Sequence, residues 1–230
     1  MTKIVFGIAI LFAVAGCAPD KSTTITFEAY VDGKPLVYGE QYPSPNGDGT
    51  FMILDFKFYI SNIRFTNSTT SELYSEIDSY HLAKFPNDSR YTISLDNLTP
   101  VDYDKIEFSI GIDEEANLGT LIAGDLDPTN QMAWNWTAGY KFLLLEGKYM
   151  PDTSNRIIPL IYHIGFNENR RDLAFKVDPS NDIRMTVDII EMFRNPTNID
   201  FHKYPQVLFN ETDASMVAKN YSEAFITITP

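Results

Sequence analysis

The stretch Lys105-Ile106-Glu107-Phe108-Ser109-Ile110-Gly111-Ile112 places an apolar side chain at every second position. A period of two is typical of a β-strand that has one buried face and one solvated face. The same alternation returns in Thr26–Val31 and in Ile183–Ile189. The sequence therefore predicts that strands build the core of this chain.

Longer apolar stretches are spread along the rest of the chain. They are rich in Ile, Phe, Tyr and Leu, as central strands would be, and they are Phe51–Phe65, Tyr140–Leu145 and Ile157–Ile164. Turn-forming clusters occur at Pro43–Gly49, Asp127–Asn130 and Asp178–Asn181. Thr212–Asn220 begins with capping residues and is the best helical candidate. We predict an all-β fold, a single antiparallel β-sandwich of Greek-key or immunoglobulin-like type with a short C-terminal helix.

The composition fits one folded domain and argues against a nucleic-acid partner. Of the 230 residues, 44% are apolar and 13% aromatic, which is enough to bury a core. There are 18 Lys and Arg against 31 Asp and Glu, so the formal net charge is −13. Binding to phosphates requires a basic face, and no basic cluster occurs in this sequence.

The N-terminus has the pattern of an export signal. Lys3 precedes the apolar run Ile4–Ala15, which is shorter than the roughly 20 residues of a membrane-spanning helix. Val14-Ala15-Gly16-Cys17 resembles a bacterial lipobox, and Cys17 is the only cysteine of the chain. We therefore expect a lipoprotein signal peptide at 1–16, a lipidated Cys17 with a tether at 17–24, and one domain at 25–230.

This pattern predicts a lipid-anchored protein of the bacterial cell envelope. The acyl chains on Cys17 would hold it to the outer membrane, on the periplasmic face or at the cell surface. An ordinary cleaved signal peptide with a leftover cysteine is the alternative.

Sequence signatures of common enzymes are missing. The chain has no glycine-rich phosphate loop, no Gly-x-Ser-x-Gly elbow and no His-Glu-x-x-His. The acidic run Asp113-Glu114-Glu115 is typical of a solvated loop on an acidic surface. We expect a protein that is not an enzyme.

The three histidines and one tryptophan-rich segment are the candidates for chemistry. His81, His163 and His202 each lie in or beside an apolar segment. Imidazole is a common ligand for copper and zinc, although a hydrogen-bonded core histidine is the simpler interpretation of each one alone.

Both tryptophans of the chain lie in the segment Gln131–Tyr140. If this segment is extended, Met132, Trp134 and Trp136 share a face. A thioether and two indoles beside imidazoles would suit Cu(I), while two tryptophans that fill the core are the structural alternative.

The segment Leu126–Phe142, followed by Leu145-Glu146-Gly147, resembles the hallmark of the MbnP-like copper-binding family. That family is associated with methanobactin operons and is common among bacterial lipoproteins. Further landmarks follow in the expected order, namely Tyr59–Arg64, Ser79–Leu82, Phe108–Asp113, Tyr162–Gly165 and Ala218–Tyr221.

The resemblance implies a non-enzymatic protein that binds copper as Cu(I) or Cu(II). On this basis His81 and His163 are the expected imidazole ligands, with Trp134 and Met132 at the same metal. It also implies an MbnH-like di-haem peroxidase as a partner, which would oxidise Trp134 or Trp136 to kynurenine.

One family ligand is absent from this sequence. Relatives carry a histidine in a Val-Met-His stretch, whereas this chain has Val207-Leu208-Phe209 there. His202 is the candidate for a replacement ligand, and loss of the metal is the alternative. A lipid-tethered module that presents its loops to a glycan or a protein partner is the alternative function.

Overall fold

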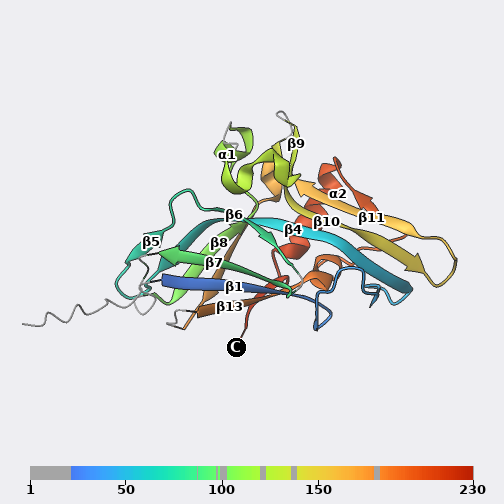
Figure 1. Ribbon diagram of the computed structural model, residues 1–230, viewed down its shortest axis with the longest axis horizontal. Coiled ribbons are helices and arrows are strands. Elements are labelled where there is room, and N and C mark those ends of the chain that lie inside the picture. Colours follow the sequence, from blue (N-terminus) through green and yellow to red (C-terminus); the bar gives the residue numbers. More distant parts are fainter. Residues whose placement is uncertain are drawn as a thin grey trace, which may run out of the picture.

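Two facing β-sheets form the body of the protein (Figure 1). The computed structural model describes residues 22–86, 88–96, 98, 103–119, 123–135, 139–178 and 182–229. The smaller sheet has the order β15-β13-β1-β2, with β7 also paired to β1. Its strands are β1 (Ser22–Val31), β2 (Lys34–Pro35), β7 (Arg90–Asp96), β13 (Asp182–Asp188) and β15 (Ile226–Ile228).

The larger sheet has the order β12-β8-β4-β10-β11-β14. Its main strands are β4 (Gly49–Thr66), β8 (Lys105–Ile110), β10 (Gly139–Pro151), β11 (Ile158–Gly165), β12 (Arg171–Lys176) and β14 (Gln206–Val207). Short strands pair with β4 and β10, namely β3 (Tyr42–Pro43), β5 (Leu73–Ser75), β6 (Tyr80–Lys84) and β9 (Ala133–Asn135). All the strands predicted from alternation and from apolar stretches are present, so the all-β prediction is confirmed.

The purely antiparallel arrangement predicted from the sequence is wrong. Strands β1 and β13 run parallel over seven residue pairs, from Thr24 with Asp182 to Tyr30 with Asp188. Strands β11 and β14 are also parallel. The sheets are therefore mixed, because β13 returns to β1 through a long crossover that alternating hydrophobicity cannot reveal.

A single large core fills the space between the two sheets. Alternate residues of β1 point into it, as do those of β13 and the inner face of β4. Phe27 of the smaller sheet meets Phe108 of the larger one edge to face, with ring centroids 5.7 Å apart. This main core confirms the buried faces expected from the period of two.

Strand β8 ends earlier than the alternation suggested because of Gly111. Its φ of +104° favours glycine, and a Cβ there would lie 2.6 Å from Cδ2 of Phe142. Gly111 donates its N–H to the carbonyl of Tyr59. The chain can therefore leave β8 at this point while β8 and β10 lie end to end along one edge of β4.

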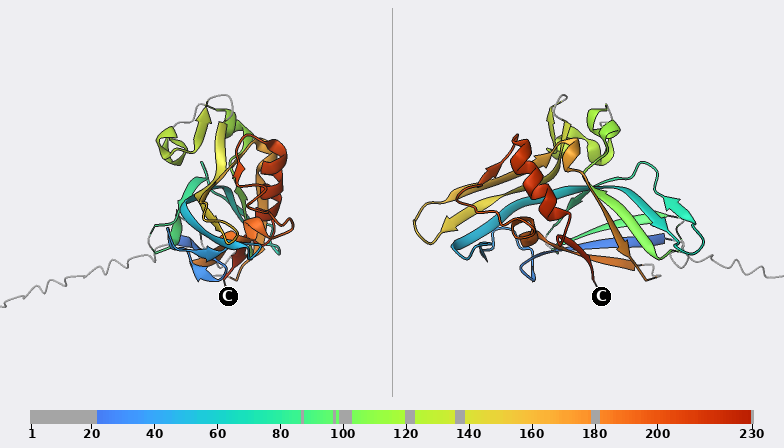
Figure 2. Two further views of the ribbon diagram at one scale, coloured as in Figure 1. Left: turned by 90° about the vertical axis from the view of Figure 1, so that its right-hand side faces the viewer. Right: turned by 180° about the vertical axis from the view of Figure 1, so that it is seen from behind.

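The segment between β8 and β10 folds over the outer face of the larger sheet, and we call it the cap. It comprises α1 (Glu114–Leu118), the short 3-10 turns η2 (Gly124–Leu126) and η3 (Pro128–Asn130), and β9. Figures 1 and 2 show α1 and β9 on the side away from β1 and β13. Asp113, expected in a solvated loop, caps α1 by accepting a hydrogen bond from the N–H of Ala116.

The cap and the sheet enclose a second apolar cluster, the outer core. Its members are Tyr59, Leu82, Ile112, Ala116, Leu126, Met132, Tyr140, Phe142 and Leu144. Polar contacts fix the cap in place, since Asp125 Oδ2 accepts the N–H of Leu82 at 2.7 Å and Tyr59 Oη donates to the Asp125 carbonyl at 2.9 Å. This second core positions Trp134 and its neighbours.

The C-terminal helix predicted at Thr212–Asn220 is present as α2 (Glu211–Tyr221). Asn210 caps its first turn by accepting from the N–H of Asp213. At its end, the buried Asn220 makes three hydrogen bonds, to the N–H and carbonyl of Thr197 and to the carbonyl of Met192. Two further 3-10 turns, η4 (Asn167–Asn169) and η5 (Ile189–Phe193), lie beside the helix.

Several sequence predictions concern residues that the structure does not describe. The signal peptide at 1–16 and the lipidated Cys17 lie outside the described residues, as does Trp136. Ser22 to Thr24, which we assigned to the tether, belong to β1. Within the described part of the chain, no helix is both long and apolar enough to cross a membrane.

Candidate functional site around Trp134

Trp134 is held at the surface of the larger sheet by a short hairpin. Strand β9 pairs with the beginning of β10, Ala133 with Tyr140 and Asn135 with Gly139. The turn before it is fixed by Asp127, which accepts the N–H of Thr129 at 2.8 Å, and by Gln131, whose φ is +62°. The hairpin directs the Trp134 ring toward the end of β11.

The indole of Trp134 packs in an aromatic cluster with Phe166 and Phe209. The ring centroids lie 5.2 Å from Phe166 and 4.9 Å from Phe209. The ring also covers Gly165, where an added Cβ would lie 2.6 Å from Trp134 Cζ3. Phe209 is 60% exposed, so the cluster reaches the protein surface.

The Nε1–H of Trp134 is buried and has no hydrogen-bond partner among the described residues. Buried polar groups in folded proteins are nearly always paired. The Nε1–H of Trp134 is therefore an unusual group, a buried donor that no described residue satisfies.

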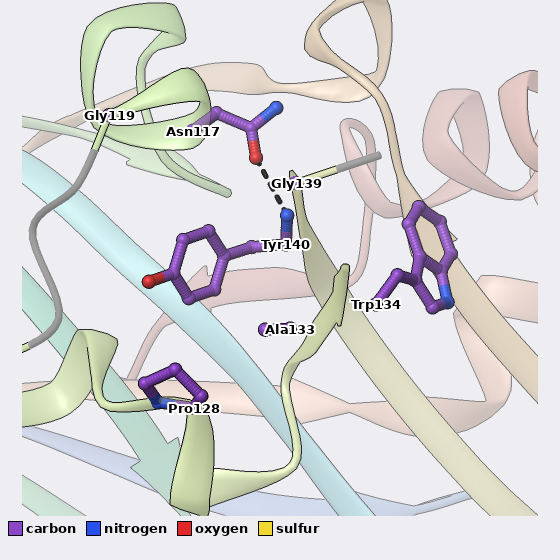
Figure 3. Close-up of a pocket in the computed structure, with 7 residues that line it drawn as sticks. All are labelled: Asn117, Gly119, Pro128, Ala133, Trp134, Gly139 and Tyr140. Atoms are coloured by element: carbon purple, nitrogen blue, oxygen red, sulfur yellow. Dashed lines mark hydrogen bonds between the residues drawn. The ribbon is translucent and has the colours of Figure 1, made fainter. Parts of the chain in front are cut away.

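A cavity of about 220 Å³ opens beside Trp134 (Figure 3). The described residues that line it are Asn117, Gly119, Pro128, Ala133, Trp134, Gly139 and Tyr140. Asn117 Oδ1 accepts the N–H of Tyr140 at 2.8 Å. Burial raises the pKa of Tyr140. These lining residues are therefore uncharged at neutral pH and suit contact with an apolar or planar group better than acid–base chemistry.

The side chain of Met132 does not reach the solvent. It is fully buried in the outer core. The thioether is thus a packing group in this structure.

His81 lies on β6 opposite Ile60 of β4, on the side of the main core. Its Nε2 is 2.8 Å from Glu76 Oε2, which also accepts a hydrogen bond from Ser79 Oγ at 2.6 Å. Burial alone would raise the pKa of Glu76, but these hydrogen bonds outweigh it and leave that pKa below its usual value. His81 therefore already has an anionic partner.

His163 lies on β11 opposite Leu144 of β10, on the side of the outer core. Its Nε2 is 2.8 Å from Glu146 Oε1. Burial lowers the pKa of His163, although the hydrogen bond to Glu146 works in the opposite direction. The ring is consequently neutral at pH 7, the form in which imidazole binds metals.

His202 lies in the segment after η5. Its Nε2 is 3.0 Å from Tyr149 Oη and 3.6 Å from Asp48 Oδ2. Each of the three histidines thus has a different carboxylate as neighbour.

The structure does not bring His81 and His163 together. Phe58 and Ile60 point into the main core, and His81 pairs with Ile60. Lys57, which directly precedes Phe58 on β4, pairs with Leu144 of β10. Leu144 in turn pairs with His163 of β11. Because neighbouring residues of a strand point to opposite faces, the two imidazoles lie on opposite faces of the larger sheet.

The same separation holds for the other donor groups. In the described ranges, no three His, Cys, Asp or Glu side chains are arranged so that they could hold a metal ion together. Because His81 and His163 lie on opposite faces of the larger sheet, they do not converge with Met132 and Trp134 on one point in the described part of the chain.

Sequence reasoning missed two members of the aromatic cluster, Phe166 and Phe209. Gly165 was the available signal, since a glycine at the end of a strand often marks a close approach by another group. Phe209, noted only for the histidine that it replaces, is in fact the residue that packs against Trp134.

The fold and the hallmark segment can be compared with known proteins. The solved structure of MbnP from Methylosinus trichosporium is similar, with a TM-score of 0.55 and 17% sequence identity, and the match covers 76% of this chain and 78% of that chain. At this identity the likeness supports the fold alone. No curated protein matches the sequence.

A sequence model of the MbnP family matches residues 20–212. This range includes both tryptophans, all three histidines and the whole cap. The resemblance found in the sequence is thereby confirmed, and this chain belongs to the MbnP family.

Proposed function

We propose that this chain is an exported, lipid-anchored protein with a methanobactin-related function in copper handling at the bacterial cell envelope. The family match over residues 20–212 carries this proposal. The lipobox-like sequence at Cys17 supports the anchor to the outer membrane, on its periplasmic face or at the cell surface. The protein acts without catalysing a reaction of its own.

Copper binding by the predicted ligands does not fit the arrangement of side chains. His81 and His163 lie on opposite faces of one sheet, and each is hydrogen-bonded to a carboxylate. The thioether of Met132 is buried in the outer core. A soft, two-imidazole site for Cu(I) would require these groups to converge.

The geometry therefore favours contact with another protein over a resident copper ion. The aromatic cluster of Trp134, Phe166 and Phe209 reaches the surface, and Phe209 packs where the family resemblance led us to expect a histidine. Exposed aromatic residues are common at the centre of protein interfaces. We place the partner contact at this cluster.

Copper binding is the second candidate, and one observation favours it. Burial lowers the pKa of His163, which keeps its imidazole unprotonated at neutral pH and available to a metal. This second candidate also includes a modification that the family resemblance implies. In it, an MbnH-like di-haem partner oxidises Trp134 or Trp136 to kynurenine.

The first experiment measures metal content and intact mass of the protein purified from its native host, with peptide mapping across Met132–Tyr140. Near one equivalent of copper with a modified tryptophan supports the second candidate. Unmodified tryptophans and no copper, even after Cu(I) is supplied, support the alternative function, a lipid-tethered module that contacts a partner protein.

A set of variants then assigns any copper that binds. Loss of copper in His81→Ala/His163→Ala, but not in His202→Ala, would show that the two histidines converge in solution and that our reading of their opposite faces is wrong. Copper affinity that is unchanged in the double variant would exclude them as ligands. Loss of partner capture in Phe209→Ala, with unchanged thermal stability, would support the contact at the aromatic cluster.

A further inference from the structure

The cavity of about 220 Å³ lies between the cap and the start of β10, and the described residues that line it include none of the three histidines. It shares Trp134 with the aromatic cluster, but the other two rings of that cluster are not among the described residues around it. Figure 3 shows Ala133 between Pro128, Tyr140 and Trp134. The cavity is therefore a candidate binding site that is separate from the histidines and from the exposed part of the aromatic cluster.

Hydrogen bonds between buried groups hold the walls of the cavity in place. Asn117 is 5% exposed, and its Oδ1 accepts the N–H of Tyr140 at 2.8 Å while its Nδ2 donates to Asn167 Oδ1 at 2.7 Å. Tyr140 Oη donates to the carbonyl of Leu126 at 2.6 Å. A Cβ at Gly139 would collide with Asn117 Oδ1, so this close approach requires glycine. The cavity is thus formed before any ligand enters, as is usual for small-molecule sites.

The polar side chains at the cavity already have partners. Both polar atoms of the Asn117 amide and the hydroxyl of Tyr140 form hydrogen bonds within the protein. The Nε1–H of Trp134 is buried and presents no surface to a ligand. A buried water needs about two to four polar partners. The cavity therefore holds water weakly, and a ligand would be bound there by dispersion and by the release of water rather than by hydrogen bonds.

The size and lining of the cavity favour a small planar ligand. An apolar cavity of about 150 Å³ encloses one benzene molecule, whereas drug-sized ligands need about 300–1,000 Å³. A volume of about 220 Å³ thus suits one ring or two fused rings. Trp134 and Tyr140 offer aromatic surface, and Gly119 and Gly139 bring bare backbone to the lining. Because aromatic rings attract one another beyond the gain from buried area, a planar ring should bind better than a saturated ring of the same size.

The charges around the cavity select against ions. No charged side chain is among the described residues that line it. Asp127 directly precedes Pro128, and hydrogen bonds from the hydroxyl and the N–H of Thr129 hold the pKa of its carboxyl below the usual range. An anion would be repelled by this carboxylate and by the net charge of −13, and a cation would find no carboxylate in the lining. A neutral ligand is therefore favoured.

We propose that this cavity binds one small, neutral aromatic molecule of one or two fused rings. A free molecule fits better than a side chain of a partner protein, because a peptide would bring backbone N–H and carbonyl groups that the paired side chains here do not satisfy. The proposal goes beyond the proposed function, since it needs neither copper nor a modified tryptophan. It rests on the preformed walls, the volume and the uncharged lining of the cavity.

Calorimetric titration of the purified protein tests the proposal. We expect indole and phenol to bind saturably at one site. Phenol should bind about fivefold more tightly than cyclohexanol, which has the same hydroxyl on a saturated ring. Benzamide should bind about tenfold more tightly than benzoate, which has nearly the same size but a negative charge. Indole should bind more tightly than Nα-acetyltryptophan amide, which carries the same rings on a peptide backbone.

Variants that fill the cavity locate the binding. Ala133→Val should weaken the binding of indole about threefold and Ala133→Leu about tenfold, because the larger side chain takes up more of the space. Ala174→Leu is the matched control, since Ala174 is an exposed residue of β12 and does not line the cavity. The thermal midpoint of each variant shows that its fold is intact, and the smaller valine keeps the test valid if leucine does not fit.

Any of four results would overturn the proposal. They are absence of saturable binding by both indole and phenol, equal binding of phenol and cyclohexanol, equal binding of benzamide and benzoate, and equal affinity for indole in Ala133→Leu and Ala174→Leu. Tighter binding of Nα-acetyltryptophan amide than of indole would also overturn it, because the cavity would then belong to a side chain of a partner protein. None of these results depends on whether copper binds, so failure here is distinct from failure of the proposed function.

Discussion

Replacement of Gly165 by alanine probes the packing of Trp134 directly. An added Cβ would lie 2.6 and 2.8 Å from Cζ3 and Cη2 of Trp134, and 2.5 Å from the carbonyl oxygen of Tyr140. Because nonbonded carbon atoms pack best at about 3.5–4.0 Å, the two Trp134 atoms would have to retreat by about 0.7–0.9 Å to reach even the lower limit. The ring cannot retreat freely, since Phe166 and Phe209 pack against it.

Overpacking of this size costs about 3 kcal/mol. Gly165 does not have a positive φ, so alanine meets no backbone penalty and restricts the unfolded chain, which returns about 0.7 kcal/mol. We expect Gly165→Ala to lower the free energy of unfolding by about 2 kcal/mol, measured by urea denaturation with circular dichroism.

A double-mutant cycle separates the clash of the added Cβ with the Trp134 ring from its clash with the Tyr140 carbonyl oxygen. In a Trp134→Ala background the ring is gone, so Gly165→Ala should cost about 1 kcal/mol less than in the wild type. Gly111→Ala is the control, because its Cβ would meet Phe142 instead, and its cost should be the same in both backgrounds. An equal cost of Gly165→Ala in both backgrounds would refute the packing of Trp134 on β11.

Three further predictions concern side chains whose roles the structure defines. Met132→Ala should lower the free energy of unfolding by about 2–4 kcal/mol while Met132→Leu costs less than about 1.5 kcal/mol, as urea denaturation would show, because the thioether is a core group. The folded protein keeps His163 neutral, because burial lowers the pKa of His163, whereas the unfolded chain takes up a proton below about pH 6.5. Stability should therefore fall as the pH drops below about 6.5, and His163→Gln should reduce that fall; an identical pH dependence of the thermal midpoint would contradict this reading. Asn220→Ala leaves three backbone groups without their partner and should cost about 3 kcal/mol in thermal or urea unfolding.

Sequence patterns predicted those strands whose burial follows from local alternation. Thr26–Val31 and Ile183–Ile189 became β1 and β13, because an alternating segment has one way to bury all its apolar side chains. Their parallel pairing could not be predicted, since the direction of a neighbouring strand is decided by the chain between them. Apart from the turn at Asp127–Asn130, the cap was not predicted, because its short elements are stabilised by the outer core and not by their own periodicity.

At the candidate site, residue types alone did not predict which side chains lie close together. His81 and His163 each sit on a strand next to apolar residues, as the sequence indicated. A shift of one residue in register moves a side chain to the other face, and registers are not visible in a sequence. The position of Trp134 was partly predictable from its hairpin, but its contacts with Phe166 and Phe209 depend on segments far away in the chain.

The parallel pairing of β1 with β13 also affects how the protein folds during its synthesis. Thr24 and its partner Asp182 are separated by 158 positions, so the first strand cannot complete its ladder until most of the chain has emerged. Until then β1 can pair with β7, but its other edge stays open to wrong partners. Folding that depends on such distant pairs is slow, because the chain must close a long loop before the contacts form. Protection of β1 by a chaperone during synthesis or export would thus matter more for this fold than for one whose first strand pairs only with near neighbours.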